Sequence, residues 1–176
     1  KSDGVADHLL PGTQLLLAYR DSHCDGSGGL AGATELTSQS FGGEGVSAII
    51  GAGCSSASLP AAQVAGLSQV PIISPSAASS ALSDGREYPY FLRTRPSADF
   101  VAIAMVDVLV HLFNYTSVAL ITSTDTYGAG VAQSFTKASR IAGLSISASV
   151  SFALGATSFA IEFETLRLSG SRVLAS

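Results

Sequence analysis

The stretch GAGCSSAS, residues 51–58, places Cys54, Ser55 and Ser56 between an apolar run and a series of small residues typical of a helix. A strand that turns into a helix here leaves unpaired backbone N–H groups at the turn. Three kinds of chemistry are compatible with these residue types: an anion site at the helix N-terminus, a thiol nucleophile, or a disulfide beside a hydroxyl-lined ligand site.

A nucleotide site is the weakest of these interpretations. The stretch has neither the lysine of a Walker loop nor the glycine spacing of a dinucleotide-binding fingerprint. A helix start with free N–H groups and the hydroxyls of Ser55 and Ser56 is compatible with an anion, because all of these groups donate hydrogen bonds.

An enzyme is not predicted. Cys54 as a nucleophile needs a base, and His23 is near only if the two loops are neighbours. The chain has no Gly-x-Ser-x-Gly elbow, its three histidines are scattered, and no metal-ligand spacing is present. We therefore expect no catalytic residues, no metal site and no cofactor.

The disulfide interpretation depends on the sheet. Cys24 and Cys54 each follow an expected strand by a few residues. If those strands are parallel neighbours, the two cysteines lie at one edge of the sheet within bridging reach. Such a bridge would imply an oxidising compartment. Two unrelated buried thiols are the alternative.

Strand-like and helix-like segments alternate along the chain, which predicts an α/β fold with a mostly parallel sheet and helices on both faces. Apolar runs predict strands at residues 13–21, 46–52, 70–74, 90–94, 116–122 and 144–152, with a last strand starting at 172. Helical periodicity and stop signals predict helices at residues 28–41, 55–67, 96–113, 127–142 and 158–169.

The polar loops gather at one edge of this predicted sheet. In parallel α/β sheets, ligands bind beyond the carboxyl ends of the strands. Four loops rich in small and polar residues follow strands in this sequence, at residues 21–24, 53–56, 74–80 and 123–127. This shared polarity predicts a binding face.

Composition excludes two classes of partner. The chain has 176 residues, a net charge of −4 and no run of lysine or arginine, so neither nucleic acid nor an anionic membrane surface is predicted as a partner. The apolar segment 101–113 is too short to span a bilayer. Charged residues make up only 12%, about half the usual share. We expect other protein chains, or further domains of a larger protein, to cover part of the surface.

Four segments in order, YRDSHCD, VSAIIGAGCSSAS, VPIISPSAASSALSDGREYPYFLRTRPSAD and YTSVALITSTDTYGAG, resemble the receptor ligand-binding region. This family is the bilobed Venus-flytrap module of type I periplasmic-binding-protein ancestry, and the resemblance looks closest to metabotropic GABA-type class C G-protein-coupled receptors. It implies that residues 1–114 form most of lobe 1, without its first strand. Residues 115–176 would begin lobe 2.

The resemblance also implies a set of site residues. It implies a disulfide between Cys24 and Cys54, and it places Ser55 and Ser56 where lobe 1 of the family holds an amino-acid carboxylate. Tyr127, in DTYG, corresponds to a ligand-facing tyrosine of lobe 2. A packing tyrosine at a helix start is the alternative interpretation.

The loop after the third expected strand departs from the family pattern. The resemblance implies that the backbone of residues 77–79, Ala77, Ala78 and Ser79, helps to hold the ligand. The family commonly has a hydroxyl residue at the position of Ala78, and the GABA-type receptors have a ligand-contacting histidine at the position of Arg95. Both changes bear on how an amino group would be held.

The function implied is an extracellular sensor module of a membrane receptor that binds an amino acid or similar small carboxylate between two lobes. Its location would be an extracellular or membrane-anchored ectodomain, or the periplasm in a bacterium. Two alternatives stay open: an architectural module that has lost ligand binding, and a bacterial solute-binding protein of an amino-acid transporter.

Overall fold

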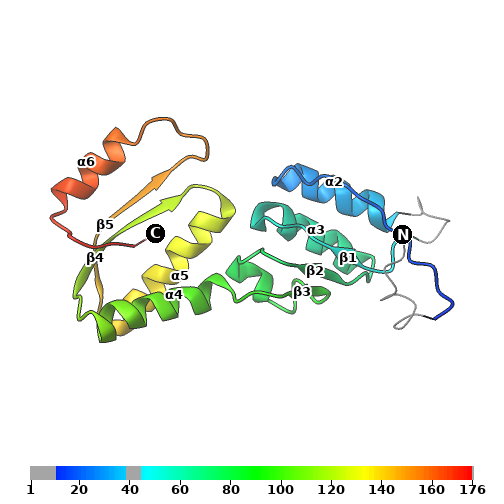
Figure 1. Cartoon of the computed structure of the whole chain (residues 1–176), viewed down its shortest axis with the longest axis horizontal. Helices are drawn as coiled ribbons and strands as arrows, with labels where there is room; N and C mark the ends of the chain where they lie inside the picture. Colours follow the sequence, from blue (N-terminus) through cyan, green and yellow to red (C-terminus); the bar gives the residue numbers. More distant parts are fainter. Residues whose placement is uncertain (1–10, 39–44, 176) are drawn as a thin grey trace.

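The computed structural model describes residues 11–38 and 45–175 and contains two parallel sheets (Figure 1). The first has the strand order β1-β2-β3 and the second β5-β4-β6, and all pairings are parallel. The strands are β1 (Ile49–Ile50), β2 (Ile72–Ser74), β3 (Phe91–Arg93), β4 (Ser117–Ser123), β5 (Ser145–Phe152) and β6 (Leu174–Ala175).

Helices connect the strands. They are α2 (Gly26–Thr37), α3 (Ser55–Leu67), α4 (Ala98–Asp107), α5 (Thr126–Ala142) and α6 (Ala160–Leu168), with a 3₁₀ turn η1 (Ser80–Ser83) and a π-helical turn η2 (Val108–Leu112) that extends α4. Figure 1 shows α5 and α6 on opposite sides of the second sheet. The predicted α/β class with parallel strands is confirmed, and α3 has the predicted bounds.

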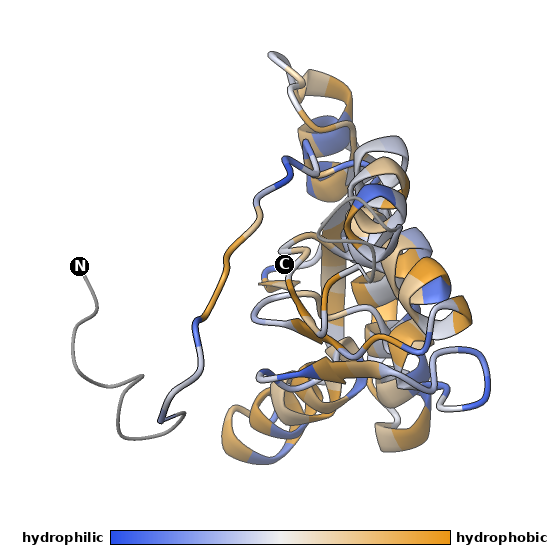
Figure 2. Cartoon of the chain, turned by 90° about the vertical axis from the view of Figure 1, so that its right-hand side faces the viewer, coloured by the Kyte–Doolittle hydropathy of each residue, from blue (hydrophilic) through white to orange (hydrophobic). Residues whose placement is uncertain are grey.

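The strand predicted at residues 13–21 is wrong, because this segment has no strand pairing. Its side chains Leu15, Leu16 and Leu17 are all exposed, and Figure 2 shows this apolar stretch standing apart from the helices and sheets. An apolar run becomes a strand only when a neighbouring strand takes up its N–H and C=O groups. In this structure β1 pairs with β2 alone.

Capping residues decide where the helices start and stop. Helix α2 begins at Gly26, two residues before its predicted start, because the Asp25 carboxylate accepts a hydrogen bond from the Gly28 N–H at 2.7 Å. Gly143 ends α5 as predicted, with φ of 74°, a left-handed conformation that glycine adopts without strain.

Helices α2 and α3 pack through small residues. Gly29 and Ala33 of α2 are buried, as are Ala57 and Ala61 of α3. A Cβ atom added at Gly29 would lie 2.2 Å from the Ala57 carbonyl oxygen, so the two helix backbones are in direct contact. This close packing requires small residues where the two helices touch.

A second core surrounds Phe135 of α5, which is completely buried. Ala102 and Val106 of α4 pack into the same core, beside Val118 and Leu120 of β4. The chain therefore passes from the first core to the second between β3 and α4. The lobe boundary at residue 114 stays a prediction for the whole receptor module.

One buried hydroxyl in this core is unsatisfied. Ser139 of α5 is 1% exposed, and its Oγ has no hydrogen-bond partner within residues 11–38 and 45–175. We expect Ser139→Ala to raise the free energy of unfolding by about 1 kcal/mol, because it removes an unpaired buried polar group. Ser134→Ala on the same helix is the matched control. It should lower stability by about 1 kcal/mol, since Ser134 Oγ donates to Asp99 at 2.7 Å. Urea unfolding of both variants measures this, and a loss of stability in Ser139→Ala contradicts it.

Candidate functional site

The start of helix α3 is fixed by the predicted disulfide. Cys24 and Cys54 are bonded to each other, with their Cα atoms 5.3 Å apart. Both cysteines of the chain are therefore paired, and neither sulfur is available as a nucleophile. The disulfide prediction is confirmed.

The two serines after Cys54 are both engaged by protein groups. Ser55 is buried, and its Oγ accepts hydrogen bonds from the N–H groups of Ala78 and Ser79, each at 3.2 Å. Ser56 Oγ donates to the Cys24 carbonyl at 2.7 Å. The structure thus brings Ser55, Ala78 and Ser79 together and turns Ser56 toward the disulfide.

The serine-rich loop after β2 holds the turn before α3. Ser74 Oγ donates to the Ala52 carbonyl at 2.6 Å, and Ser76 Oγ donates to the Gly53 carbonyl at 2.7 Å. Ser74 Oγ also accepts from the Ala77 N–H at 3.0 Å, so this predicted donor is already bound. The serines of these loops satisfy backbone groups that a buried turn cannot leave unpaired.

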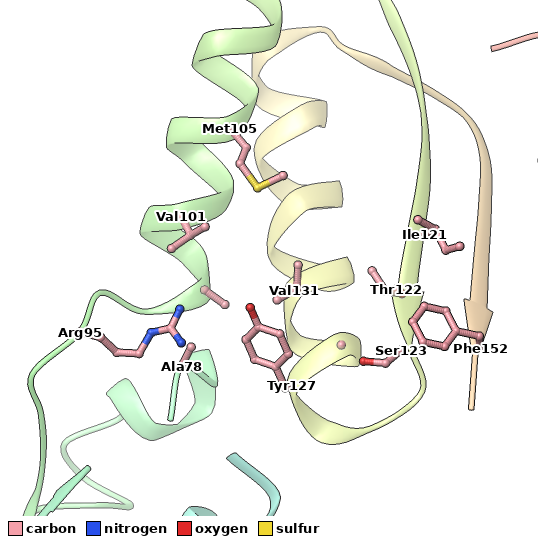
Figure 3. Close-up of a pocket in the computed structure, with 12 residues that line it drawn as sticks. Ala78, Arg95, Val101, Met105, Ile121, Thr122, Ser123, Tyr127, Val131 and Phe152 are labelled. Atoms are coloured by element: carbon pink, nitrogen blue, oxygen red, sulfur yellow. The ribbon is translucent and has the colours of Figure 1, made fainter. Parts of the chain in front are cut away.

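A cavity of about 230 Å³ lies between α4 and α5, at the carboxyl ends of β4 and β5 (Figure 3). We call it the Arg95 cavity. Ala78, from the loop after β2, and Arg95, from the segment after β3, contribute to one side. The remaining lining residues come from α4, β4, α5 and β5: Ala98, Val101, Met105, Ile121, Thr122, Ser123, Tyr127, Gly128, Val131 and Phe152.

Arg95 and Tyr127 face each other across this cavity. Figure 3 shows the Arg95 guanidinium and the Tyr127 hydroxyl turned toward one another. Arg95 is held in place by a hydrogen bond from Nη1 to the Ser76 carbonyl at 3.0 Å. Tyr127 stands in the first turn of α5, and it is 42% exposed.

The charged groups around the cavity are fixed by hydrogen bonds. Burial raises the pKa of the Asp125 carboxyl. Hydrogen bonds from the Ser123 hydroxyl and the N–H groups of Gly128 and Tyr127 more than offset this, so the pKa lies below its ordinary value. Burial also lowers the pKa of Arg93, which the negative charge of Asp99 partly opposes. Asp125 is therefore ionised at neutral pH.

A series of hydrogen bonds connects the two halves of the protein, which are the parts built around the first and the second core. Ser80 in η1 lies 3.0 Å from Ser134 in α5, measured between the two hydroxyl oxygens, and Ser134 donates to Asp99 of α4. A second, more open hollow of about 460 Å³ lies beside this contact, between η1 and the start of α5.

Two of the six predicted ligand residues, Ala78 and Tyr127, line the Arg95 cavity. Ser55 accepts hydrogen bonds from the N–H groups of Ala78 and Ser79 beside the cavity. Ser56 and Ala77 are bound to other protein groups. The ligand set itself stays a prediction. The sequence does not reveal the apolar wall of the cavity, because apolar side chains look the same whether they line a site or a core. This wall consists of Val101, Met105, Ile121, Val131 and Phe152.

The part of the chain that the structure describes contains no group of three or more histidine, cysteine, aspartate or glutamate side chains that could hold a metal ion. Its helices are all too short or too polar to cross a membrane.

The fold and this cavity define a class of protein. A cavity at the carboxyl ends of parallel strands is the place where open α/β sheets bind ligands. Residues 4–172 match the family described as receptor family ligand binding region, so the chain belongs to that family.

The chain is also similar to particular receptors. It is 38% identical over 101 residues to a probable metabotropic glutamate receptor, mgl-1, of Caenorhabditis elegans. It is 37% identical over 96 residues to metabotropic glutamate receptor 8 of Homo sapiens and of Mus musculus. These matches cover 57% and 54% of this chain and 10% of each relative. The chain therefore spans about a tenth of the length of these relatives.

Proposed function

We propose that this chain is part of an extracellular sensor module of a membrane receptor, which binds an amino acid or similar small carboxylate between two lobes. The observation that carries the proposal is the Arg95 cavity, because segments from both halves of the chain line it. A ligand in such a cavity contacts both halves at once and favours the arrangement that brings them together.

The resemblance of the whole chain to ligand-binding receptor regions supports a binding role rather than a catalytic one. The chemistry of the α3 start agrees with a carboxylate nearby. Ser55 Oγ accepts two backbone hydrogen bonds, and its own O–H donates to no group among the described residues. A hydroxyl with both lone pairs occupied still has its proton to donate.

The test is ligand-dependent stabilisation of the complete protein. Amino acids and small carboxylates are added singly, and thermal unfolding is followed. A ligand at about a hundredfold excess over its Kd should raise the free energy of unfolding by about 2.7 kcal/mol. Tyr127→Phe should weaken this shift, because it removes a hydroxyl that faces the cavity. Tyr19→Phe is the matched control, since Tyr19 is 77% exposed and does not line the cavity.

A module that serves only as an interaction surface is the second candidate. The bonding of Ser55, Ser56 and the N–H groups of residues 77–79 to other protein groups favours it, because the predicted carboxylate cradle is filled. A folded complete protein that shows no shift with any compound would support this candidate and contradict the sensor proposal.

A further inference from the structure

The Arg95 cavity combines one fixed cation with an apolar wall. Among the described residues that line it, Arg95 is the one charged side chain, and most of the others are aliphatic or aromatic. Tyr127, Thr122 and Ser123 supply hydroxyl groups. This composition constrains which ligand can be held there, and the inference below rests on the proposed function.

Arg95 is prepared to hold an anion. A guanidinium carries five N–H donors in a planar fork, and the hydrogen bond to the Ser76 carbonyl uses only Nη1. Figure 3 shows the end of the side chain directed into the cavity, toward the Tyr127 hydroxyl. A carboxylate placed there can accept from the guanidinium and from the tyrosine together, and guanidinium and carboxylate match in geometry.

An ammonium group would lack a charge partner on this wall. Among the described residues that line the cavity, none is a carboxylate that would neutralise it. Asp99 accepts from Ser134, and Asp125 accepts from Ser123, Tyr127 and Gly128, so both neighbouring carboxylates already serve other donors. An ammonium has three donors to satisfy, and burying it unpaired beside a guanidinium is costly.

Two alanines add apolar surface to the cavity and offer no partner to an ammonium group. Ala78 and Ala98, which are fully or almost fully buried, are apolar lining residues of the cavity. Val101, Met105 and Val131 continue the apolar wall along α4 and α5. An unbranched hydrocarbon chain fits against such a wall, because burial of apolar surface is its main source of binding energy.

We propose that the ligand of the Arg95 cavity is an aliphatic carboxylate that lacks an α-ammonium group. A cavity of about 230 Å³ has room for a small aliphatic carboxylate. Hexanoate is a probe of this class. Its carboxylate would lie between Arg95 and Tyr127, with its chain directed along Val101, Met105 and Val131.

The experiment compares three compounds with the same carbon chain by titration calorimetry on the complete protein. Hexanoate has the carboxylate alone, norleucine adds an α-ammonium group, and hexanamide removes the charge. We expect hexanoate to bind at least about tenfold more tightly than either of the others, which corresponds to the loss of one charged hydrogen bond.

Variants then assign the binding to the cavity. Arg95→Gln should weaken hexanoate binding at least about tenfold. Arg86→Gln is the matched control, because Arg86 is exposed and does not line the cavity. Circular dichroism shows whether Arg95→Gln disturbs folding. If it does, the comparison of the three ligands on the unaltered protein still tests the inference.

The outcomes separate this inference from the proposed function. Norleucine or another amino acid binding as tightly as hexanoate overturns the inference and leaves the sensor proposal standing. Hexanoate binding that is unchanged in a folded Arg95→Gln variant also overturns it. A folded protein that binds none of the amino acids and carboxylates overturns both.

Discussion

Removing the disulfide with the double change Cys24→Ala and Cys54→Ala is expected to lower the free energy of unfolding by about 3–4 kcal/mol. The bond joins residues 30 positions apart, and closing a loop of this size restricts the unfolded chain by about that free energy. The folded chain also depends on it, because the segment before α2 has no place in a sheet. This segment is also held by the hydrogen bond from Ser56 Oγ to the Cys24 carbonyl and by the Arg20–Glu35 ion pair.

Guanidinium chloride unfolding measures this effect. Dithiothreitol should destabilise the unaltered protein by a similar amount and should leave the double alanine variant unchanged, which is the internal control. A loss below about 1 kcal/mol in the double variant would contradict the loop-closure argument.

Gly29→Ala is expected to lower the free energy of unfolding by at least about 2 kcal/mol. The new Cβ would lie 2.2 Å from the Ala57 carbonyl oxygen and 2.7 Å from the Ala57 Cα, and both are backbone atoms that cannot turn away. Helix α2 must therefore move off α3. The higher helix propensity of alanine, worth about 1 kcal/mol, opposes this effect without cancelling it.

Gly26→Ala is the matched control on the same helix. A Cβ at Gly26 would lie 3.7 Å from the Ser56 carbonyl oxygen, which is an ordinary contact. We expect a change smaller than about 1 kcal/mol in urea unfolding. Equal losses of stability in Gly29→Ala and Gly26→Ala would contradict the argument that a Cβ at residue 29 pushes α2 away from α3.

The sequence alone determined the class of fold and most of its elements. The continuous apolar runs at β4 and β2 indicate strands buried in a parallel sheet, and the small-residue helix at α3 lies where its pattern predicts. These features are local, so periodicity and turn residues are enough to recognise them. The strand predicted at residues 13–21 is wrong for the opposite reason, because strand formation depends on a distant partner.

Only the tertiary structure decided what the polar residues do. The sequence places Ser55 and Ser56 at a helix start, where they are equally suited to a ligand or to the protein's own backbone. The structure gives them backbone partners from residues 24, 78 and 79. Arg95 and Tyr127 are 32 positions apart, yet they face one cavity because α4 and α5 pack side by side. Hydrogen-bond and charge pairing depend on distances between segments, and packing rather than local sequence sets those distances.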